Sequence, residues 1–256
     1  MSTQARVSTS SLRVKKAKGQ KITMLTAYDA PMASFIDQAG VDIVLVSDAV
    51  GTVGNGRPEA VSVTVDEMIY HSRAVRNGAK RCLVVTTLPF GSYSTPEEGV
   101  RAVVGAGIPV MGHVGVTKQK IVQAGRIRLP AQDAASAANT IDDALEMARA
   151  GCFAIVLECL PDRLGRIITQ SLDIPTIGIG SGSDCDGQAL VTQDMLGLYK
   201  ELSPRFLKVY ADLAGTIVSA LGQFRGEVEG RTFPGPEHAY QIDDGELNKL
   251  AQQLRR

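Results

Sequence analysis

Residues 84–93 read VVTTLPFGSY, a short β-branched run that ends in a threonine pair and enters a turn. Valine and threonine favour strands, and the proline and glycine that follow are typical of turns. The stretch therefore predicts a buried strand whose polar end, Thr86 and Thr87, faces a site. Comparable runs in this chain end in a carboxylate, so the sequence raises the question of what the threonines replace.

Six further runs of the same kind are separated by Ala-rich amphipathic segments. Near-continuous apolar strands that alternate with helices indicate a parallel sheet covered on both faces. Several runs end in polar or glycine residues, and α/β barrels place their chemistry at the carboxyl ends of the strands. A doubly wound sheet is the alternative, but no GxGxxG motif opens a helix after the first strand. The predicted strands are KITMLTA (21–27), DIVLVSD (42–48), CLVVTTL (82–88), IPVMGHVG (108–115), FAIVLEC (153–159), IPTIGIG (174–180) and FLKVY (206–210).

The strand count is one short of a closed barrel of this type, which has eight. Residues 95–107 leave room for only about one short helix between the third and fourth runs. Outer helices are predicted at 30–40 and 140–151, each ending at a glycine, and residues 116–139 are predicted to form a lid or an oligomer contact. The sequence thus predicts an α/β barrel that lacks one βα unit.

The domain organisation follows from composition. Residues 1–20 are rich in Ser, Lys and Arg and are predicted to be a partly disordered lead-in. Residues 21–256 are predicted to form a single (β/α) barrel domain with a C-terminal helical tail from Ala211.

The charge balance limits the classes of partner. The 256 residues include 27 Lys and Arg against 27 Asp and Glu, so the formal net charge is zero. Such a chain offers no field that attracts nucleic acid or anionic lipid, and no run approaches the ~18 apolar residues of a membrane span. We expect a small-molecule partner and neither a nucleic acid nor a membrane. The four cysteines lack CxxC spacing, which predicts reduced thiols in a cytoplasmic protein.

Seven sequence blocks closely resemble, in order, those of the ketopantoate hydroxymethyltransferase family. The resemblance implies a (β/α)8 TIM barrel of the phosphoenolpyruvate mutase/isocitrate lyase type, usually assembled into a large ring, so a homo-oligomer is expected. It also implies transfer of a one-carbon unit from 5,10-methylenetetrahydrofolate to 3-methyl-2-oxobutanoate, which gives 2-dehydropantoate for pantothenate biosynthesis. The blocks are LTAYD (25–29), VSDAVG (46–51), TLPFGSY (87–93), VMGHVG (110–115), VLECLP (156–161), PTIGIGSGSDCDGQ (175–188) and FPGPEH (233–238).

The implied chemistry assigns roles to matched residues. A magnesium ion chelated by the carboxylate and ketone oxygens of the 2-oxo acid acts as a Lewis acid, so that a base can remove the C3 proton and form an enolate. By the resemblance, Glu158 is that base and Asp48 is a metal ligand. The positions implied to bind substrate are Tyr28, Ser47, Asp48, Ala49, Thr87 and His113.

Each assignment has a plainer interpretation. Glu158 is alternatively a solvated strand-end acid, and Asp48 a helix cap. A lone histidine on an apolar run, such as His113, is often a packed core residue, while Tyr28 and Ser47 are alternatively ordinary rim packing.

The chain departs from the family pattern at the metal site. The family's second metal carboxylate precedes the LPF motif, where this chain has Thr87, and its K-x-E-G-G strand has no counterpart here. The region between TPEE and IPVMGH is roughly two dozen residues shorter than in the family, about one βα unit. An error in the recorded sequence would explain the shortening, but not Thr87, which lies outside it. A hydroxyl brings no charge to the ion, so a weakened magnesium site is expected.

Two hypotheses follow. In the first, the chain is an enzyme of the family that enolises a 2-oxo acid with Glu158 and still uses the folate co-substrate. In the second, it is a catalytically impaired homologue that acts as a binding or assembly partner, because two metal-site carboxylates are absent.

Overall fold

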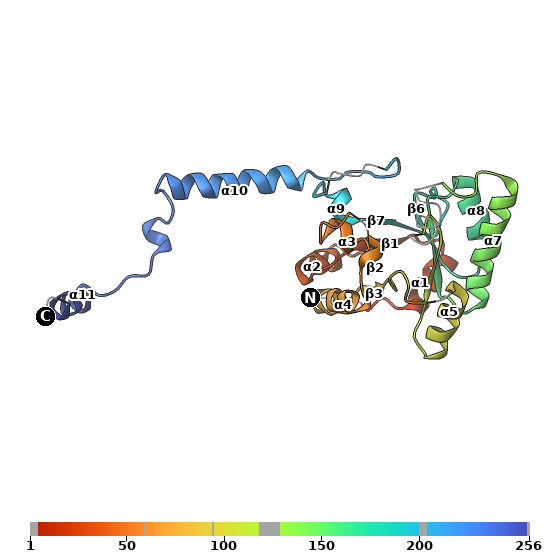
Figure 1. Ribbon diagram of the computed structural model, residues 1–256, viewed down its shortest axis with the longest axis horizontal. Helices are drawn as coiled ribbons and strands as arrows, with labels where there is room; N and C mark the ends of the chain where they lie inside the picture. Colours follow the sequence, from red (N-terminus) through yellow and green to blue (C-terminus); the bar gives the residue numbers. More distant parts are fainter. Residues whose placement is uncertain (1–4, 59, 94, 118–128, 200–203, 255–256) are drawn as a thin grey trace. The chain divides into compact units, whose positions relative to one another are not determined.

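The computed structural model describes residues 5–58, 60–93, 95–117, 129–199 and 204–254 (Figure 1). Over these residues the strands are β1 (Ile22–Thr26), β2 (Ile43–Val46), β3 (Leu83–Thr86), β4 (Met111–Gly115), β5 (Ala154–Glu158), β6 (Thr176–Ile179) and β7 (Gly187–Leu190). The helices are α1 (Thr9–Ala17), α2 (Ala30–Gln38), α3 (Val50–Val53), α4 (Val65–Gly78), α5 (Pro96–Gly105), α7 (Ala134–Arg149), α8 (Asp162–Ser171), α9 (Thr192–Met195), α10 (Leu213–Glu229) and α11 (Asp244–Gln253), with short 3₁₀ turns η1 (Ala60–Ser62) and η2 (Pro236–His238).

The strands form a curled parallel sheet in the order β3-β2-β1-β7-β6-β5-β4. Within the described residues the sheet has seven strands, and β3 and β4 form its two edges. These are the strands between which the sequence lacks room for a further βα unit. The prediction of a TIM-like barrel missing one unit is therefore confirmed, and the missing unit leaves the sheet unclosed at β3 and β4.

One predicted strand is wrong and another strand was missed. FLKVY at 206–210 is not a strand, and the seventh place is taken by β7, which pairs with both β1 and β6. The β7 sequence, GQAL, lacks the β-branched residues that mark a strand. Asp186, immediately before it, accepts hydrogen bonds from the backbone and hydroxyl of Thr176, which hold the start of β7 beside β6. Tertiary pairing rather than local propensity therefore decides the seventh strand.

Capping side chains set where the outer helices begin. Asp29 accepts a hydrogen bond from the Met32 amide at the start of α2, and Asp133 does the same for Ser136 at the start of α7. Gly40 and Gly151, both with positive φ, follow the ends of these helices. The predicted helix at 30–40 is confirmed, and the one at 140–151 begins earlier, at Ala134. Of the segment predicted to be a lid or an oligomer contact, residues 118–128 lie outside the described residues.

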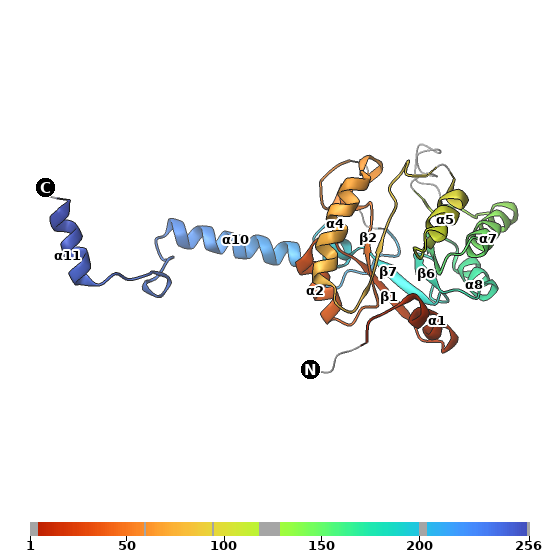
Figure 2. The ribbon, with the colours of Figure 1, turned by 90° about the horizontal axis from the view of Figure 1, so that it is seen from below.

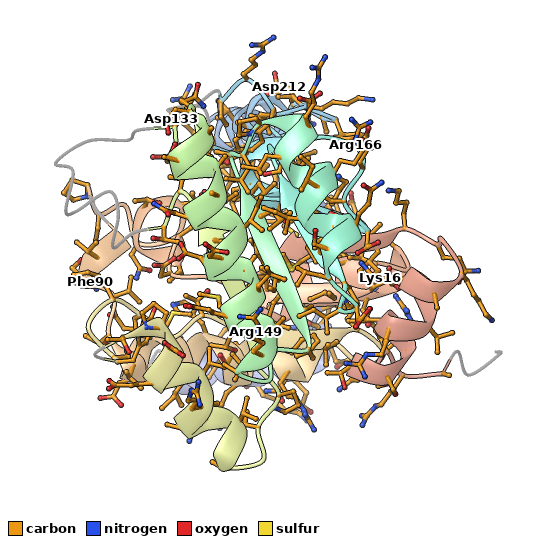
Figure 3. The ribbon with its side chains drawn as sticks, turned by 90° about the vertical axis from the view of Figure 1, so that its right-hand side faces the viewer. Lys16, Phe90, Asp133, Arg149, Arg166 and Asp212 are labelled. Atoms are coloured by element: carbon orange, nitrogen blue, oxygen red, sulfur yellow. The ribbon has the colours of Figure 1, made fainter. Side chains whose placement is uncertain are left out.

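Two outer apolar layers and one inner core hold the barrel together. The layer between β1–β3 and helices α2 and α4 is built on Val44, Val46 and Val75, as Figure 2 helps to follow. The layer between β4–β6 and helices α7 and α8, which lie side by side in Figure 3, is built on Ile155 and Leu157. The inward faces of the strands form the interior cluster; its members include Met24, Leu45, Val85, Met111 and Ile179.

Helix α1 differs from the partly disordered lead-in expected for residues 1–20. Leu12 of α1 is fully buried in the interior cluster with Ile22 and Ile43. Two lysines of the same helix form ion pairs, Lys15 with Asp42 at 2.6 Å and Lys16 with Asp186 at 2.7 Å. Composition alone missed this helix because its attachment depends on one apolar side chain and on partners far along the chain.

The C-terminal residues form a compact unit of their own. The chain divides into two compact units, residues 1–211 and residues 212–256. In the second unit Phe233 packs its ring against Phe224 of α10 and His238 of η2. In the described part of the chain, no helix is both long and apolar enough to cross a membrane.

Candidate active site

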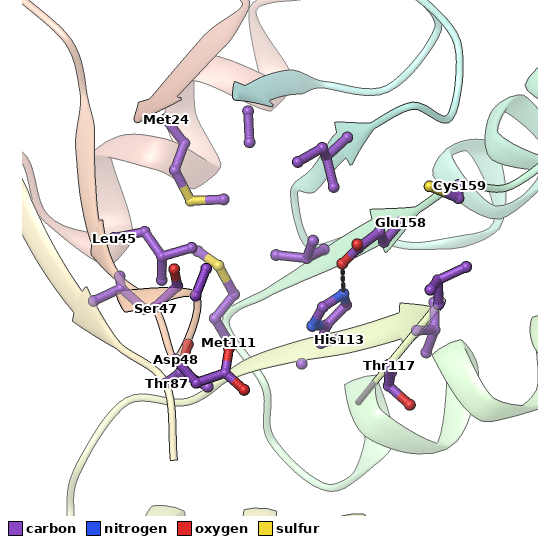
Figure 4. A pocket seen from close by; sticks show the side chains of 18 of the residues that line it. Met24, Leu45, Ser47, Asp48, Thr87, Met111, His113, Thr117, Glu158 and Cys159 are labelled. Atoms are coloured by element: carbon purple, nitrogen blue, oxygen red, sulfur yellow. Dashed lines mark ion pairs between the residues drawn. The ribbon is translucent and has the colours of Figure 1, made fainter. Parts of the chain in front are cut away.

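A cavity of about 2280 Å³ lies inside the curled sheet, within residues 1–211, and includes the carboxyl ends of several strands (Figure 4). One wall comes from the end of β2, where Ser47 and Asp48 are buried polar residues and Ala49 precedes α3. Figure 4 shows Asp48 and Thr87 across the cavity from His113 and Glu158. Six of the seven residues that the sequence assigns to the site thus line one cavity; the seventh is Tyr28.

Tyr28 is buried behind the cavity wall. Its phenol shares a 2.9 Å hydrogen bond with the Ser47 hydroxyl, and its carbonyl accepts a 2.8 Å hydrogen bond from Nδ1 of His71 on α4. Burial raises the pKa of Tyr28 to about 12, so the phenol stays protonated. Tyr28 therefore supports Ser47 from behind and does not itself line the cavity. His71 is a supporting residue that sequence reasoning missed, because its partner is a backbone carbonyl on another element.

The two threonines at the end of β3 face opposite ways. The Thr86 hydroxyl shares a 2.8 Å hydrogen bond with Ser72 of α4, which directs it out of the barrel. Thr87 donates its amide to the Val46 carbonyl at 2.9 Å and lines the cavity beside Asp48. Both threonines line the cavity, but the Thr86 hydroxyl is engaged by Ser72.

His113 and Glu158 form a close pair on the opposite wall. Nε2 of His113 lies 2.8 Å from Oε2 of Glu158, and both side chains are partly exposed, at 42% and 28%. The register pairs Glu158 with Gly115, which has no side chain, so the carboxylate is free to lean towards His113 two residues earlier on β4. A Cβ at Gly115 would lie 2.0 Å from the Glu158 carbonyl oxygen. This position therefore requires glycine.

A buried serine holds the turn that follows Glu158. The Ser181 hydroxyl donates to the Leu157 carbonyl at 2.8 Å and accepts the Leu160 amide at 3.0 Å. Between them, Cys159 adopts a positive φ of 55°, which L residues rarely do. Sequence reasoning missed Ser181, because the Gly-rich stretch around it gave no sign that one hydroxyl would bridge two segments.

Asp194 is a further carboxylate on the cavity wall. It lies on α9, which is attached to β1 because Thr192 donates its hydroxyl to the Thr26 carbonyl and its amide to the Thr26 hydroxyl. Burial raises the pKa of Asp194 to about 6, and among the described residues its Oδ1 has no hydrogen-bond partner. The sequence gave no hint of this residue, because the strand that carries it to the rim, β7, was itself missed.

The donor set fits a weak magnesium site. In the described parts of the chain, no three His, Cys, Asp or Glu side chains gather closely enough to hold a metal ion. Magnesium commonly uses one or two carboxylates and completes its shell with water and substrate oxygens. Asp48 supplies one carboxylate, and the Ser47 and Thr87 hydroxyls beside it are neutral oxygens. This set can hold a hydrated ion together with a chelating substrate, but with less negative charge than two carboxylates would bring.

Burial disfavours the reactive thiolate form of the four cysteines. All four are free thiols. Burial raises the pKa of Cys82 to about 12 and that of Cys152 and Cys159 to about 11, and it also raises the pKa of Cys185. The thiolate is the reactive form, so these side chains serve packing.

Comparison with solved structures gives the class of the fold. The chain is similar to 2,3-dimethylmalate lyase, a PEP mutase/isocitrate lyase superfamily member, with a TM-score of 0.52 and 14% identity over 98% of each chain. It is also similar to phosphoenolpyruvate phosphomutase from Streptomyces platensis subsp. rosaceus, with a TM-score of 0.53 and 14% identity over 97% of this chain and 98% of that one. The protein therefore has the barrel of the PEP mutase/isocitrate lyase class.

Sequence comparison gives the family. The model of the ketopantoate hydroxymethyltransferase family matches residues 6–102 and 96–236. A 3-methyl-2-oxobutanoate hydroxymethyltransferase from Nitratidesulfovibrio vulgaris (strain DP4) is 46% identical over 263 residues, covering 91% of this chain and 86% of the relative. The enzyme of the same name from Moorella thermoacetica is 43% identical over 268 residues, covering 94% of this chain and 100% of the relative. The chain belongs to the ketopantoate hydroxymethyltransferase family.

The same alignments locate what the chain lacks. An aligned length of 263 residues exceeds the 256 residues of the whole chain, so the relative has residues without a counterpart here. The two segments matched by the family model meet at residues 96–102, in α5, between the edge strands β3 and β4. The sheet opening and the alignments therefore agree on the place of the missing unit.

Proposed function

We propose that the chain transfers a hydroxymethyl group from 5,10-methylenetetrahydrofolate to 3-methyl-2-oxobutanoate and so forms 2-dehydropantoate. The names of the similar proteins support the reaction. The observation that carries the proposal for this chain is the placement of Glu158, paired with His113, across one cavity from Asp48. This arrangement offers a base on one side and an oxygen-ligand wall on the other.

Proton removal is the step that these residues serve. The Glu158 carboxylate takes the proton from C3 of the 2-oxo acid, and the C–H electron pair becomes the C2=C3 double bond of an enolate. His113, 2.8 Å from the carboxylate, holds it in position and stabilises its charged form. The enolate carbon then bonds to the methylene carbon of the folate, the bonds from that carbon to the folate nitrogens break, water supplies the hydroxyl oxygen, and tetrahydrofolate leaves.

Substrate binding falls to the opposite wall. Asp48, with the hydroxyls of Ser47 and Thr87, would hold a magnesium ion that polarises the ketone when it is bound. Tyr28 fixes the Ser47 hydroxyl from behind, and Ala49 lines the cavity between Asp48 and α3. These roles, like that of Glu158, are proposals for mutagenesis.

The test is loss of the C3 proton signal of 3-methyl-2-oxobutanoate in heavy water, followed by proton NMR with protein and magnesium. Exchange above the buffer rate supports the proposal, and formation of 2-dehydropantoate on addition of the folate completes it. A folded protein that gives no exchange would contradict it.

The second candidate function is a catalytically impaired homologue that acts as a binding or assembly partner. Thr87 in place of a carboxylate and the open edge between β3 and β4 favour it, because both weaken the same wall of the cavity. Binding of the 2-oxo acid without exchange would select this candidate.

We also propose that the chain forms a homo-oligomer in the cytoplasm. Helix α10 of the C-terminal unit has no buried residue, and its exposed apolar side chains include Ile217, Val218, Leu221 and Phe224. Sedimentation velocity of the full chain tests the assembly, and a monomer at all concentrations would contradict it.

A further inference from the structure

The cavity continues sideways between the two edge strands. Val85 of β3 and Met111 of β4 belong to the interior cluster, whereas Val84 packs in the layer under α2 and α4, and Val110 in the layer under α7 and α8. All four line the same cavity. The cavity also reaches Val103 of α5, and among the described residues β3 and β4 are the strands that have an unpaired edge, so the cavity extends to α5 through the opening between them. In a closed barrel, the absent strand would fill this space.

The lateral part of the cavity has apolar walls. Beyond the strand edges it is lined by Val100 and Val103 of α5, the helix that leads from β3 to β4. We call this region the side slot; it consists of Val84, Val85, Val100, Val103, Val110 and Met111. Carboxylates of Glu97 on α5 and Glu146 on α7 line the cavity near the same helices. The slot therefore suits an uncharged apolar chain and disfavours an anionic one.

The inner end of the side slot meets the catalytic wall. Thr87 directly follows β3, and His113 lies two residues beyond Met111 on β4. The side slot therefore adjoins both walls of the proposed site, the oxygen-ligand wall at Thr87 and the wall of the proposed base at His113.

We propose that the side slot receives the C3 substituent of the substrate, so that this chain acts on 2-oxo acids with a longer apolar chain than that of 3-methyl-2-oxobutanoate. The inference rests on the proposed function, because it uses the same base and the same oxygen wall. The proton balance is unchanged: Glu158 takes the C3 proton, the enolate forms, and in heavy water a deuteron returns to C3.

The first experiment compares two substrates with the full chain and magnesium. C3 exchange in heavy water is followed for 3-methyl-2-oxobutanoate and for 2-oxooctanoate. We expect 2-oxooctanoate to exchange with a KM about tenfold lower, because added methylenes become buried in the slot. Exchange of the short acid, with neither exchange nor binding of 2-oxooctanoate, would overturn the inference and leave the proposed function standing.

A pair of variants on α5 localises the effect. Val103→Trp fills the slot, while Ala102→Trp adds the same side chain at an exposed neighbour that does not line the cavity. We expect Val103→Trp to lower the ratio of kcat/KM for 2-oxooctanoate over the short acid about tenfold, and Ala102→Trp to leave both values unchanged. An equal ratio in the two variants would place the long chain elsewhere and overturn the inference.

If the short acid does not exchange, binding measured by titration calorimetry tests the side slot separately from the proposed function. That result would contradict the proposed function, and the slot would then be judged by binding alone. Binding of 2-oxooctanoate that Val103→Trp weakens and Ala102→Trp does not would support the slot as an apolar-chain site. Absence of binding would overturn it.

Discussion

Glu158 contacts His113, although the strand register places it beside Gly115. The carboxylate leans back along β4 and reaches Nε2 of His113 at 2.8 Å. A Cβ at Gly115 would lie 2.0 Å from the carbonyl oxygen of Glu158, so the backbone beside the proposed base requires glycine at this position. The pair faces Asp48 across the cavity, which makes proton removal the first step to test.

Replacing the proposed base should remove C3 exchange. Glu158→Gln retains the shape of the side chain and can still bond His113, but it cannot accept the proton. We expect the exchange rate of 3-methyl-2-oxobutanoate to fall by about 10²–10⁴. Glu146→Gln, which neutralises another acid on the same cavity, is the matched control. Unchanged exchange in Glu158→Gln would remove Glu158 from the mechanism.

Restoring a carboxylate at the end of β3 should strengthen magnesium binding. Thr87→Asp places a second negative charge beside Asp48, and we expect about tenfold tighter binding by titration calorimetry, roughly 1.4 kcal/mol. Thr86→Asp is the control for the position of the added charge, because the neighbouring Thr86 side chain bonds Ser72 of α4. No gain from Thr87→Asp would show that more of the metal site than this carboxylate has been lost.

The stability of the fold should depend on pH through Asp194. Its pKa is raised from 3.8 to about 6 by burial, so the folded state favours the protonated form. The stabilising contribution of protonated Asp194 is fully present below pH 3.8 and is lost as the pH rises through about 6. We expect Asp194→Asn to raise the free energy of unfolding near neutral pH by about 1–2 kcal/mol, a range reduced for partial exposure, and the gain to vanish in acid. Urea unfolding across this range measures the difference, and a gain independent of pH would contradict the assignment.

Helix α1 should contribute to the stability of the barrel. Leu12 is fully buried in the interior cluster, and we expect Leu12→Ala to lower the free energy of unfolding by about 2–5 kcal/mol. Val14→Ala on the same helix, where the side chain is 51% exposed, should change it by no more than about 0.5 kcal/mol. Equal effects of the two substitutions in thermal or urea unfolding would mean that α1 is not packed against the barrel.

Local patterns were sufficient for much of the fold and for part of the site. The β-branched runs marked six of the seven strands, because buried parallel strands need near-continuous apolar sequence. Polar residues at the carboxyl ends of parallel strands were predicted to lie together, and four of them, Asp48, Thr87, His113 and Glu158, line one cavity. Tyr28 was also found, but its place behind Ser47 depends on packing.

The amino-acid sequence by itself determined the class of fold, the family and the loss of one βα unit, since these depend on periodicity, on ordered motifs and on length. Tertiary structure alone decided that GQAL is a strand, that Leu12 is buried in the interior cluster, and that Ser181 and Asp194 belong to the site. It also decided that the missing unit leaves a slot between β3 and β4. The reason is that each of these features depends on partners distant in the chain, and a pairing or an opening of that kind exists only once the sheet has curled.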